Sequence, residues 1–217
     1  MGKKLSKEEI IKALLDASFF RSTGATSLSD VAEQLGVKKV SLYNHFEGRD
    51  DIVAQTMDFC AEYIRSINFM PDDVASVAQK YSAETVLKGI VNRYFKMHEK
   101  TPLFQIYTFI ESQKYFFKIA SDVVKEENEK LVSQTMEVFQ ALYKNNKLKI
   151  PSFKMQMYAT WFCSGISDQL SLYLMPKKQQ IMENPATGEG ELFSLVPDKN
   201  SLDAVDAFVD HFASIIS

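Results

Sequence analysis

The sequence is poor in the residues that build disulfide or metal frameworks. Its two cysteines, Cys60 and Cys163, lie far apart and fit neither a disulfide pattern nor a zinc spacing, so we expect both to be buried small hydrophobic side chains. The histidines His45, His98 and His211 each lack a second candidate ligand three or four positions away, which argues against a metal site. Nothing in the composition indicates a cofactor.

Catalytic motifs are also missing. Carboxylates that could do acid-base work, such as Glu99, Glu111 and Asp168, are scattered along the chain. No serine or cysteine lies in a nucleophile motif. The sequence therefore does not indicate an enzyme.

Long hydrophobic runs are absent. No stretch approaches the roughly 18 uncharged apolar residues that a membrane span requires, and the opening MGKKLSKEEI has no apolar segment for export. The start also matches the short myristoylation pattern, which is too unspecific to carry a prediction. We therefore expect a cytoplasmic protein that does not contact a membrane.

The chain has no excess of positive charge, since its formal net charge is −3. Residues 1–50 carry eight Lys and Arg against seven Asp and Glu, whereas residues 51–217 carry 17 against 21. This balance excludes a protein coated in positive charge for nonspecific nucleic-acid binding. A slight basic bias remains at the N-terminus.

Strand-like alternation is missing, and helical periodicity covers nearly the whole chain. Apolar residues recur every three or four positions, as in Ile10, Leu14 and later Val86 and Ile90, and prolines fall between the periodic runs. We predict an all-α protein of about nine helices, with a long loop before the last helix that either forms a surface excursion or covers a ligand site. The helices are predicted near residues 6–22, 28–35, 39–45, 49–69, 82–99, 102–113, 116–146, 152–175 and 201–216, and the loop over residues 176–200.

A change in helix length divides the chain. The first three predicted helices are short and punctuated by Gly24, Gly36 and Gly48, whereas the later ones are long and rich in Phe, Met and Tyr. We place a domain boundary here, with residues 1–48 as a helix-turn-helix domain and residues 49–217 as a larger helical domain.

The stretch from Ser27 to Phe46 predicts two short helices joined by a tight turn. Ser27 and Asp30 form a capping box, so a helix begins at Leu28. It ends before Gly36, the residue that adopts the left-handed conformation most readily. The small Ala32 lets the second helix cross closely. This spacing is typical of a helix-turn-helix.

In that motif the second helix enters the major groove of DNA and its exposed side chains reach the bases. Lysine can donate to guanine, asparagine can pair with adenine, tyrosine can bond a phosphate, and an apolar side chain can contact a thymine methyl. Lys39 and Tyr43 are expected to share one face at i and i+4. Three further residues, Thr26, Ser27 and Arg49, begin helices where phosphate contacts are favourable. The candidate DNA-binding residues are Thr26, Ser27, Lys38, Lys39, Val40, Tyr43, Asn44 and Arg49.

A plain helical corner with a solvated lysine pair would explain the same stretch. The residues at fixed spacing, however, carry a sharper resemblance: TSLSDVA at 26–32, LGV at 35–37, SLYNHF at 41–46, and then Gly48 and Arg49, with Phe20 and Gly24 in register. These motifs, over about residues 6–55, resemble the N-terminal domain of TetR-type transcriptional regulators. Val40, Asn44 and Arg49 depart from the family's usual residues, and the first two leave the operator sequence open.

The resemblance implies a three-helix DNA-binding unit attached to a larger helical domain that forms a dimer and usually binds a small molecule. The segment 94–117 is dense in Tyr, Phe and Met with a few polar groups, which core packing alone would also explain. With the resemblance, we expect a mostly apolar cavity whose helices lie near 82–99, 102–113 and 116–146, and in which Glu111 favours a cationic group. The candidate ligand contacts are Tyr94, His98, Tyr107, Glu111 and Trp161.

The last two predicted helices carry wide apolar stripes. In the family, two such helices pair with their copies as a four-helix bundle, while the alternative is that both stripes pack inward. The candidate interface residues are Phe153, Met157, Val205, Phe208, Val209 and Phe212. A symmetric dimer would match a palindromic operator.

The sequence thus predicts a homodimeric regulator that binds a double-stranded DNA operator and an apolar small-molecule effector, most simply as a repressor. Two alternatives stay open. One is a ligand-independent regulator or an activator with the same DNA-binding unit. The other is a helical ligand-binding protein that no longer binds DNA.

Overall fold

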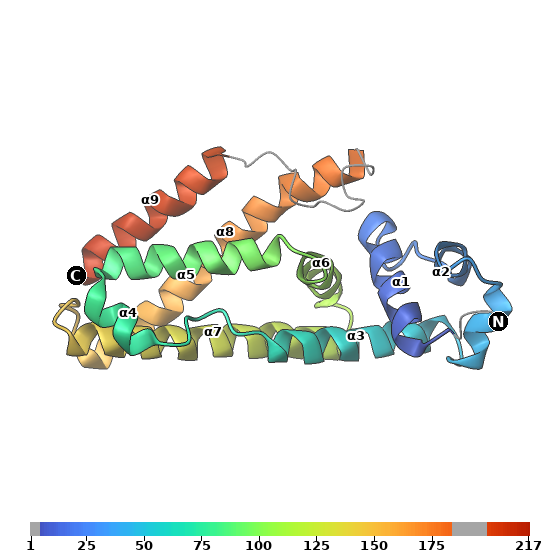
Figure 1. Cartoon of the computed structure of the whole chain (residues 1–217), viewed down its shortest axis with the longest axis horizontal. Helices are drawn as coiled ribbons and strands as arrows, with labels where there is room; N and C mark the ends of the chain where they lie inside the picture. Colours follow the sequence, from blue (N-terminus) through green and yellow to red (C-terminus); the bar gives the residue numbers. More distant parts are fainter. Residues whose placement is uncertain (1–4, 184–198) are drawn as a thin grey trace. The chain divides into compact units, whose positions relative to one another are not determined.

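The computed structural model describes residues 5–183 and 199–217, and every regular element in these ranges is a helix (Figure 1). None of the helices described is long and apolar enough to cross a membrane. The α-helices are α1 (Lys7–Arg21), α2 (Leu28–Gln34), α3 (Arg49–Ser66), α4 (Val74–Lys80), α5 (Ala83–His98), α6 (Leu103–Gln113), α7 (Lys118–Lys144), α8 (Met155–Glu183) and α9 (Lys199–Ile216). Two 3₁₀ helices, η1 (Lys39–Asn44) and η2 (Ser152–Lys154), complete the set. The prediction of an all-α chain is confirmed.

The chain folds into two compact units, each assembled from two separate stretches. Unit 1 holds residues 1–67 and 101–127, and unit 2 holds residues 68–100 and 128–217. The functional boundary near residue 48 stays a prediction.

Unit 1 packs α1 against α2, α3 and α6 (Figure 1). Its core contains fully buried side chains from each part, including Ile10, Leu14, Leu42 and Phe104. The ring of Phe19 on α1 meets Phe104 on α6 edge to face, with centroids 5.2 Å apart. Each fully buried side chain of this kind contributes about 1.5–3 kcal/mol relative to exposure, so α6 is part of the core that holds the N-terminal helices.

Unit 2 is built around aromatic side chains of α7, α8 and α9. Phe139, Phe162 and Phe212 contact one another, with the Phe162 and Phe212 centroids 4.9 Å apart. The helix α9 packs on both α5 and α8 (Figure 1). The buried Cys163 belongs to this core, while Cys60 is buried in unit 1, so both cysteines are small core side chains as predicted. Burial raises the pKa of the Cys163 thiol to about 11.

Two elements differ from the sequence-based prediction. The helix α4 was not predicted, because its seven residues offer one buried side chain, Ala78, and hence almost no periodicity. The segment predicted as a helix over 39–45 is a short 3₁₀ helix, a form whose tighter winding leaves no separate trace in a hydrophobic pattern.

The predicted end of a helix at residue 175 and the loop from residue 176 are wrong, because α8 continues through Pro176 to Glu183. Proline removes one helical hydrogen bond, but the turns beyond it are held by packing in unit 2. Lys177 is 4% exposed and its ammonium lies 2.7 Å from a carboxylate oxygen of Glu99, while Ile181 is 1% exposed. The rest of the predicted loop, residues 184–198, lies outside the described residues.

Candidate nucleic-acid interface

The start of α2 is fixed by the capping box that the sequence predicts. The Ser27 hydroxyl accepts from the Asp30 N–H at 3.3 Å, and the Asp30 carboxylate accepts from the Ser27 N–H at 2.7 Å. The Ser27 hydroxyl also donates to the Asp30 carboxylate at 2.7 Å, and the bonds that this carboxylate accepts, first from the Ser27 N–H and then from the hydroxyl, lower its pKa. The cap sets where α2 begins and leaves Ser27 itself exposed at the surface.

The turn after α2 reverses the chain into η1. Gly36 adopts a φ of 64°, and its N–H donates to the Glu33 carbonyl at 3.0 Å. The next N–H, that of Val37, donates to the Ala32 carbonyl at 2.9 Å, so the carbonyls at the end of α2 are satisfied. The glycine and the small Ala32 therefore bring η1 tightly onto α2, as the spacing predicts.

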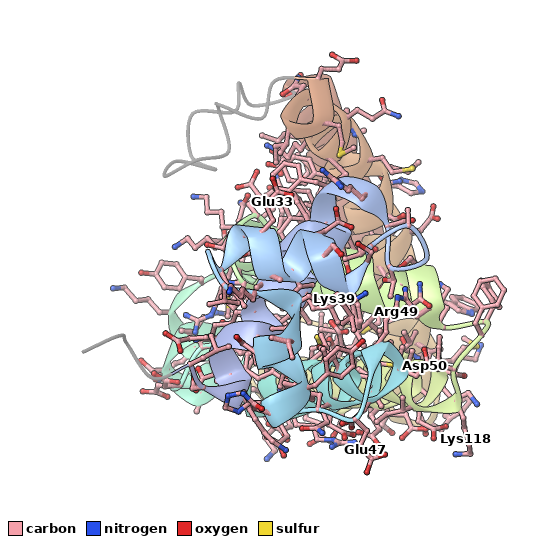
Figure 2. The ribbon with its side chains drawn as sticks, turned by 90° about the vertical axis from the view of Figure 1, so that its right-hand side faces the viewer. Glu33, Lys39, Glu47, Arg49, Asp50 and Lys118 are labelled. Atoms are coloured by element: carbon pink, nitrogen blue, oxygen red, sulfur yellow. The ribbon has the colours of Figure 1, made fainter. Side chains whose placement is uncertain are left out.

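The exposed part of η1 carries the residues predicted to contact bases. Lys38, Lys39 and Asn44 are exposed, Val40 is 67% exposed and Tyr43 is 50% exposed. Within the described residues, none of the polar side chains in this set has a hydrogen-bond or ion-pair partner. Figure 2 looks onto the end of unit 1 that carries η1, with Lys39 labelled.

The 3₁₀ winding changes which of these side chains align. Side chains at i and i+3 eclipse in a 3₁₀ helix, so Val40 and Tyr43 share one edge, whereas i and i+4 do not. The expectation that Lys39 and Tyr43 share a face is therefore wrong, because it assumed α-helical winding. Leu42 remains the buried anchor of η1 at 1% exposure.

Thr26 and Arg49 make their hydrogen bonds inside the fold. The Thr26 hydroxyl donates to the Ser22 carbonyl at 2.8 Å, and the residue is 1% exposed. The Arg49 guanidinium donates from Nε to the Thr26 carbonyl at 2.9 Å and from Nη2 to the Thr23 carbonyl. Its remaining Nη1 lies 3.7 Å from the Asp50 carboxylate. Arg49 thus fastens the loop before α2 to the start of α3.

Acidic side chains border the same end of unit 1. Figure 2 labels Asp50 next to Arg49, and Glu33 and Glu47 above and below them in the same view. All three carboxylates belong to exposed residues. The surface is therefore of mixed charge, and its lysines supply a local rather than a general attraction for phosphates.

The residues predicted to contact a ligand belong to both units. In unit 2, Tyr94 and His98 are buried at 3% and 1% exposure, with His98 Nδ1 2.8 Å from the Tyr94 carbonyl oxygen and its ring stacked on Phe69. In unit 1, Tyr107 is half-buried, and Glu111 is paired with Lys114 at 2.7 Å. Each of these contacts with a ligand stays a prediction.

Trp161 lies on the outside of α8 and is 56% exposed, with its ring against Tyr158 at 5.6 Å. It continues an exposed apolar stripe with Phe153 and Met157. Trp161 therefore lies on this stripe, next to residues predicted for the dimer interface, and its contact with a ligand stays a prediction.

The residues predicted for the dimer interface on α9 mostly pack inward. Val205, Val209 and Phe212 are buried within unit 2, because the apolar face of α9 is covered by α5 and α8 of the same chain. Phe208 is half-buried, and its ring approaches Gly165 so closely that a Cβ there would overlap it. By contrast, Phe153 of η2 is 83% exposed and Met157 of α8 is 36% exposed.

One buried polar cluster is not indicated by the sequence. The Lys177 ammonium and the Tyr173 hydroxyl both bond the Glu99 carboxylate, and the ammonium also lies 4.6 Å from the centre of the Tyr173 ring. Burial also lowers the pKa of the next residue, Lys178, to about 8. No local pattern pairs α5 with the end of α8, so this cluster could be found only in the folded chain.

Comparisons with known proteins agree with this geometry. Residues 20–56 match the family model described as bacterial regulatory proteins, tetR family. The chain is 25% identical over 147 residues to the biofilm operon icaADBC HTH-type negative transcriptional regulator IcaR of Staphylococcus aureus, a region that covers 63% of this chain and 77% of that protein.

Solved structures with the same fold include two regulators of low sequence identity. A TetR transcription regulator from Haloarcula marismortui has a TM-score of 0.63 at 13% identity, covering 97% of each chain. A transcriptional regulator from Saccharomonospora viridis in complex with choline has a TM-score of 0.60 at 11% identity, again covering 97% of each chain. At these identities the likeness concerns the fold.

Proposed function

We propose that this chain, which belongs to the TetR family of DNA-binding transcriptional regulators, is a homodimeric repressor that a small molecule releases from a palindromic operator. The observation that carries the proposal is the exposed edge of η1, where Val40 and Tyr43 are presented between Lys39 and Asn44 on a turn held by the Ser27 cap and Gly36. These side chains have the chemistry and the exposure that reading DNA requires.

The roles within this edge follow from side-chain chemistry. Lys38 and Lys39 donate to phosphates or to guanine, Asn44 pairs with adenine, and Val40 contacts a thymine methyl. Tyr43 bonds a phosphate through its hydroxyl. Ser27 is exposed and adds a phosphate contact, while Thr26 and Arg49 support the loop that positions it.

Repression is supported by the similarity to IcaR, which is named as a negative transcriptional regulator. Response to a ligand is supported by the choline complex of a protein with the same fold. We infer that the effector binds the conformer in which the two DNA-binding units are wrongly spaced, because a ligand shifts an equilibrium only through its different affinities for the two states. The proposed contacts are Tyr94, His98, Tyr107 and Glu111.

A dimer is supported by the exposed apolar stripe of α8. Phe153 of η2 and Met157 and Trp161 of α8 recur every fourth residue and leave an apolar face open along η2 and the first turns of α8. Pairing of this face with its copy gives an isologous interface, which presents two η1 elements to two half-sites.

Selection of genomic fragments by the purified full chain, at near-physiological salt, tests the proposal. The wild type should enrich one palindromic site, and a Lys39→Ala/Tyr43→Ala double variant should not, although it folds equally well because both side chains are exposed. If the folded dimer enriches no site, the alternative of a ligand-binding protein without DNA binding replaces this proposal. Loss of operator affinity on adding effector separates a ligand-responsive repressor from a ligand-independent one.

A further inference from the structure

Unit 2 contains a cavity whose lining includes none of the residues proposed above for DNA, effector or dimer contacts. It has a volume of about 260 Å³ and lies between α4 and α5, which meet near the start of α5 in unit 2 (Figure 1). This volume is close to the lower end of the roughly 300–1,000 Å³ of small-molecule pockets. The residues that line it are Pro71, Val77, Tyr81, Thr85, Val86, Gly89, Ile90 and Arg93.

The inner wall of the cavity is apolar. Val86 and Ile90 are buried at 4% and 3% exposure and lie one helical turn apart on α5, while Val77 of α4 is half-buried. Such a wall gains about 25 cal/mol for each Å² of apolar ligand surface that it removes from water. The body of a ligand here is therefore apolar.

The wall is held in place by bonds outside the cavity. The Lys147 ammonium donates to the carbonyls of Gln79, at 2.7 Å, and of Tyr81, which fixes the end of α4. The Ser82 hydroxyl accepts from the Thr85 N–H at 3.2 Å and caps α5. Both helices that form the cavity are thus anchored where they meet, and the space between them is already formed.

Gly89 opens the cavity on its α5 side. A Cβ built at this glycine meets nothing within 4 Å, although the residue lies in the middle of a helix. Glycine in a helix interior costs about 1 kcal/mol relative to alanine. The free space beside Gly89 therefore belongs to the mouth of the cavity and can be filled without a clash.

Arg93 is the charged group of the lining. Its one hydrogen bond within the described residues runs from Nη2 to the Asn68 carbonyl at a long 3.4 Å, and no carboxylate there lies within ion-pair distance. Because Arg93 both lines the cavity and is exposed, its guanidinium marks the side that opens to solvent. Its fork of donors matches a carboxylate geometrically.

We propose that this cavity binds a small apolar carboxylate, with the hydrocarbon body against Val77, Val86 and Ile90 and the carboxylate on the Arg93 guanidinium. The site is separate from the residues proposed above for the effector, and binding to it does not require DNA. Its ion pair is partly exposed, so its affinity falls as salt is added.

Octanoate is the probe, with octanol and octylammonium as the neutral and cationic molecules of the same length. Methyl NMR spectra of the full chain report the occupied site directly, because Val77, Val86 and Ile90 line the cavity. Octanoate should shift these methyl signals saturably. The affinity for octanol should be lower by about tenfold or more, since octanol lacks the charge-assisted bonds to Arg93.

Variants assign the binding to named groups. Arg93→Gln should weaken octanoate binding about tenfold or more, whereas Lys96→Gln, an exposed cation on the same helix outside the lining, should leave it unchanged. Gly89→Phe should abolish binding by filling the mouth, while Gly89→Ala should retain it. Circular dichroism and thermal melting check that each variant folds.

Three results would overturn the proposal. Equal binding of octanol or octylammonium would exclude a carboxylate site. Unchanged octanoate affinity in the Gly89→Phe variant would show that the ligand binds elsewhere. Methyl signals of Val77, Val86 and Ile90 that do not shift with octanoate would show that the cavity does not bind it. Operator binding is no part of these measurements, so their failure and the failure of the repressor proposal are distinguishable.

Discussion

Lys39 and Arg49 are two cations at the same end of unit 1 with different surroundings. Lys39 is exposed and has no partner within the described residues, whereas Arg49 donates to the carbonyls of Thr23 and Thr26. We expect Lys39→Ala to reduce operator affinity and leave the free energy of unfolding within about 0.5 kcal/mol of wild type. Arg49→Gln should lower that free energy by about 1–2 kcal/mol, because two carbonyls lose a charged donor.

Urea unfolding of both variants, beside operator titrations, measures the two effects separately. Arg49→Lys serves as the control that keeps the charge and loses the fork of donors. If Arg49→Gln unfolds like wild type and only DNA binding changes, the guanidinium contacts phosphate rather than the loop.

Asp16 gives unit 1 a pH-dependent stability. Burial raises the pKa of its carboxyl, although the side-chain amides of Gln105, at 2.5 Å, and Gln34, at 3.2 Å, partly oppose the shift. A raised native pKa means that the native state holds its proton more strongly. The contribution of Asp16 is therefore fully present below the ordinary pKa near 3.8 and is lost as pH rises through the raised value.

The Asp16→Asn variant removes this titration. The unfolding free energy of the variant minus that of wild type should increase as pH is raised from the acid range to neutrality, whatever the constant difference between the two proteins. Denaturant unfolding at several pH values measures it. A difference that stays flat or decreases would show that burial of Asp16 carries no penalty.

Residues whose roles are local can be predicted from the sequence, and residues with distant partners cannot. Ser27 and Asp30 bond each other three positions apart, and Gly36 needs only its own φ, so the start and end of α2 follow from the sequence. From the sequence alone, Arg49 is predicted to be a surface cation, because the carbonyls to which it donates come close only after the chain folds.

At the scale of elements, the contact of α8 with α9 depends on a glycine. A Cβ at Gly165 would overlap the Phe208 ring, so Gly165→Ala should lower the free energy of unfolding by about 1–3 kcal/mol through overpacking. The double variant Gly165→Ala/Phe208→Leu should recover part of this loss, because the smaller side chain makes room. A double-mutant cycle from urea unfolding measures the coupling. Additive losses would mean that the two positions do not touch.

The last turns of α8 depend on the buried ion pair between Lys177 and Glu99. Lys177→Met should lower the free energy of unfolding by about 1–3 kcal/mol, because the partly buried Glu99 carboxylate loses its cation. Adding Glu99→Gln should restore part of the loss, since no unpaired charge then remains. Amide exchange should quicken over residues 177–183 in the single variant. Unchanged exchange there would show that Ile181 alone holds these turns.

Long helices with a regular apolar stripe are predicted well, and their exceptions share a cause. The pattern indicates α5, α6 and α7 within a few residues of their observed bounds. It stops α8 at Pro176, because proline is a local signal for a break and the contacts that override it come from α5. Periodicity also cannot separate a short 3₁₀ helix such as η1 from an α-helix.

At the scale of the whole molecule, the exposed stripe of α8 predicts the oligomeric state. Trp161→Glu puts a charge in the middle of the proposed interface and should give a monomer in analytical ultracentrifugation. Operator affinity should then fall by about 100-fold or more, because a monomer no longer holds a second DNA-binding unit close to the second half-site. Tyr115→Glu, at an 84% exposed aromatic residue of unit 1, is the matched control and should remain dimeric. A dimeric Trp161→Glu variant would place the interface elsewhere.

Unit 1 is assembled from two separate stretches of the chain, and this limits which parts of such a regulator can be exchanged between proteins. The stretch from residue 101 to 127 supplies α6, whose Phe104 packs on Phe19 and whose Gln105 bonds Asp16. A fragment that ends at residue 67 would leave this side of α1 bare. The N-terminal helices that are proposed to bind DNA therefore cannot be transferred alone from one protein to another. A working chimera has to inherit α6 together with α1, so, if η1 binds DNA as proposed, exchange of DNA specificity is confined to the few positions exposed on η1.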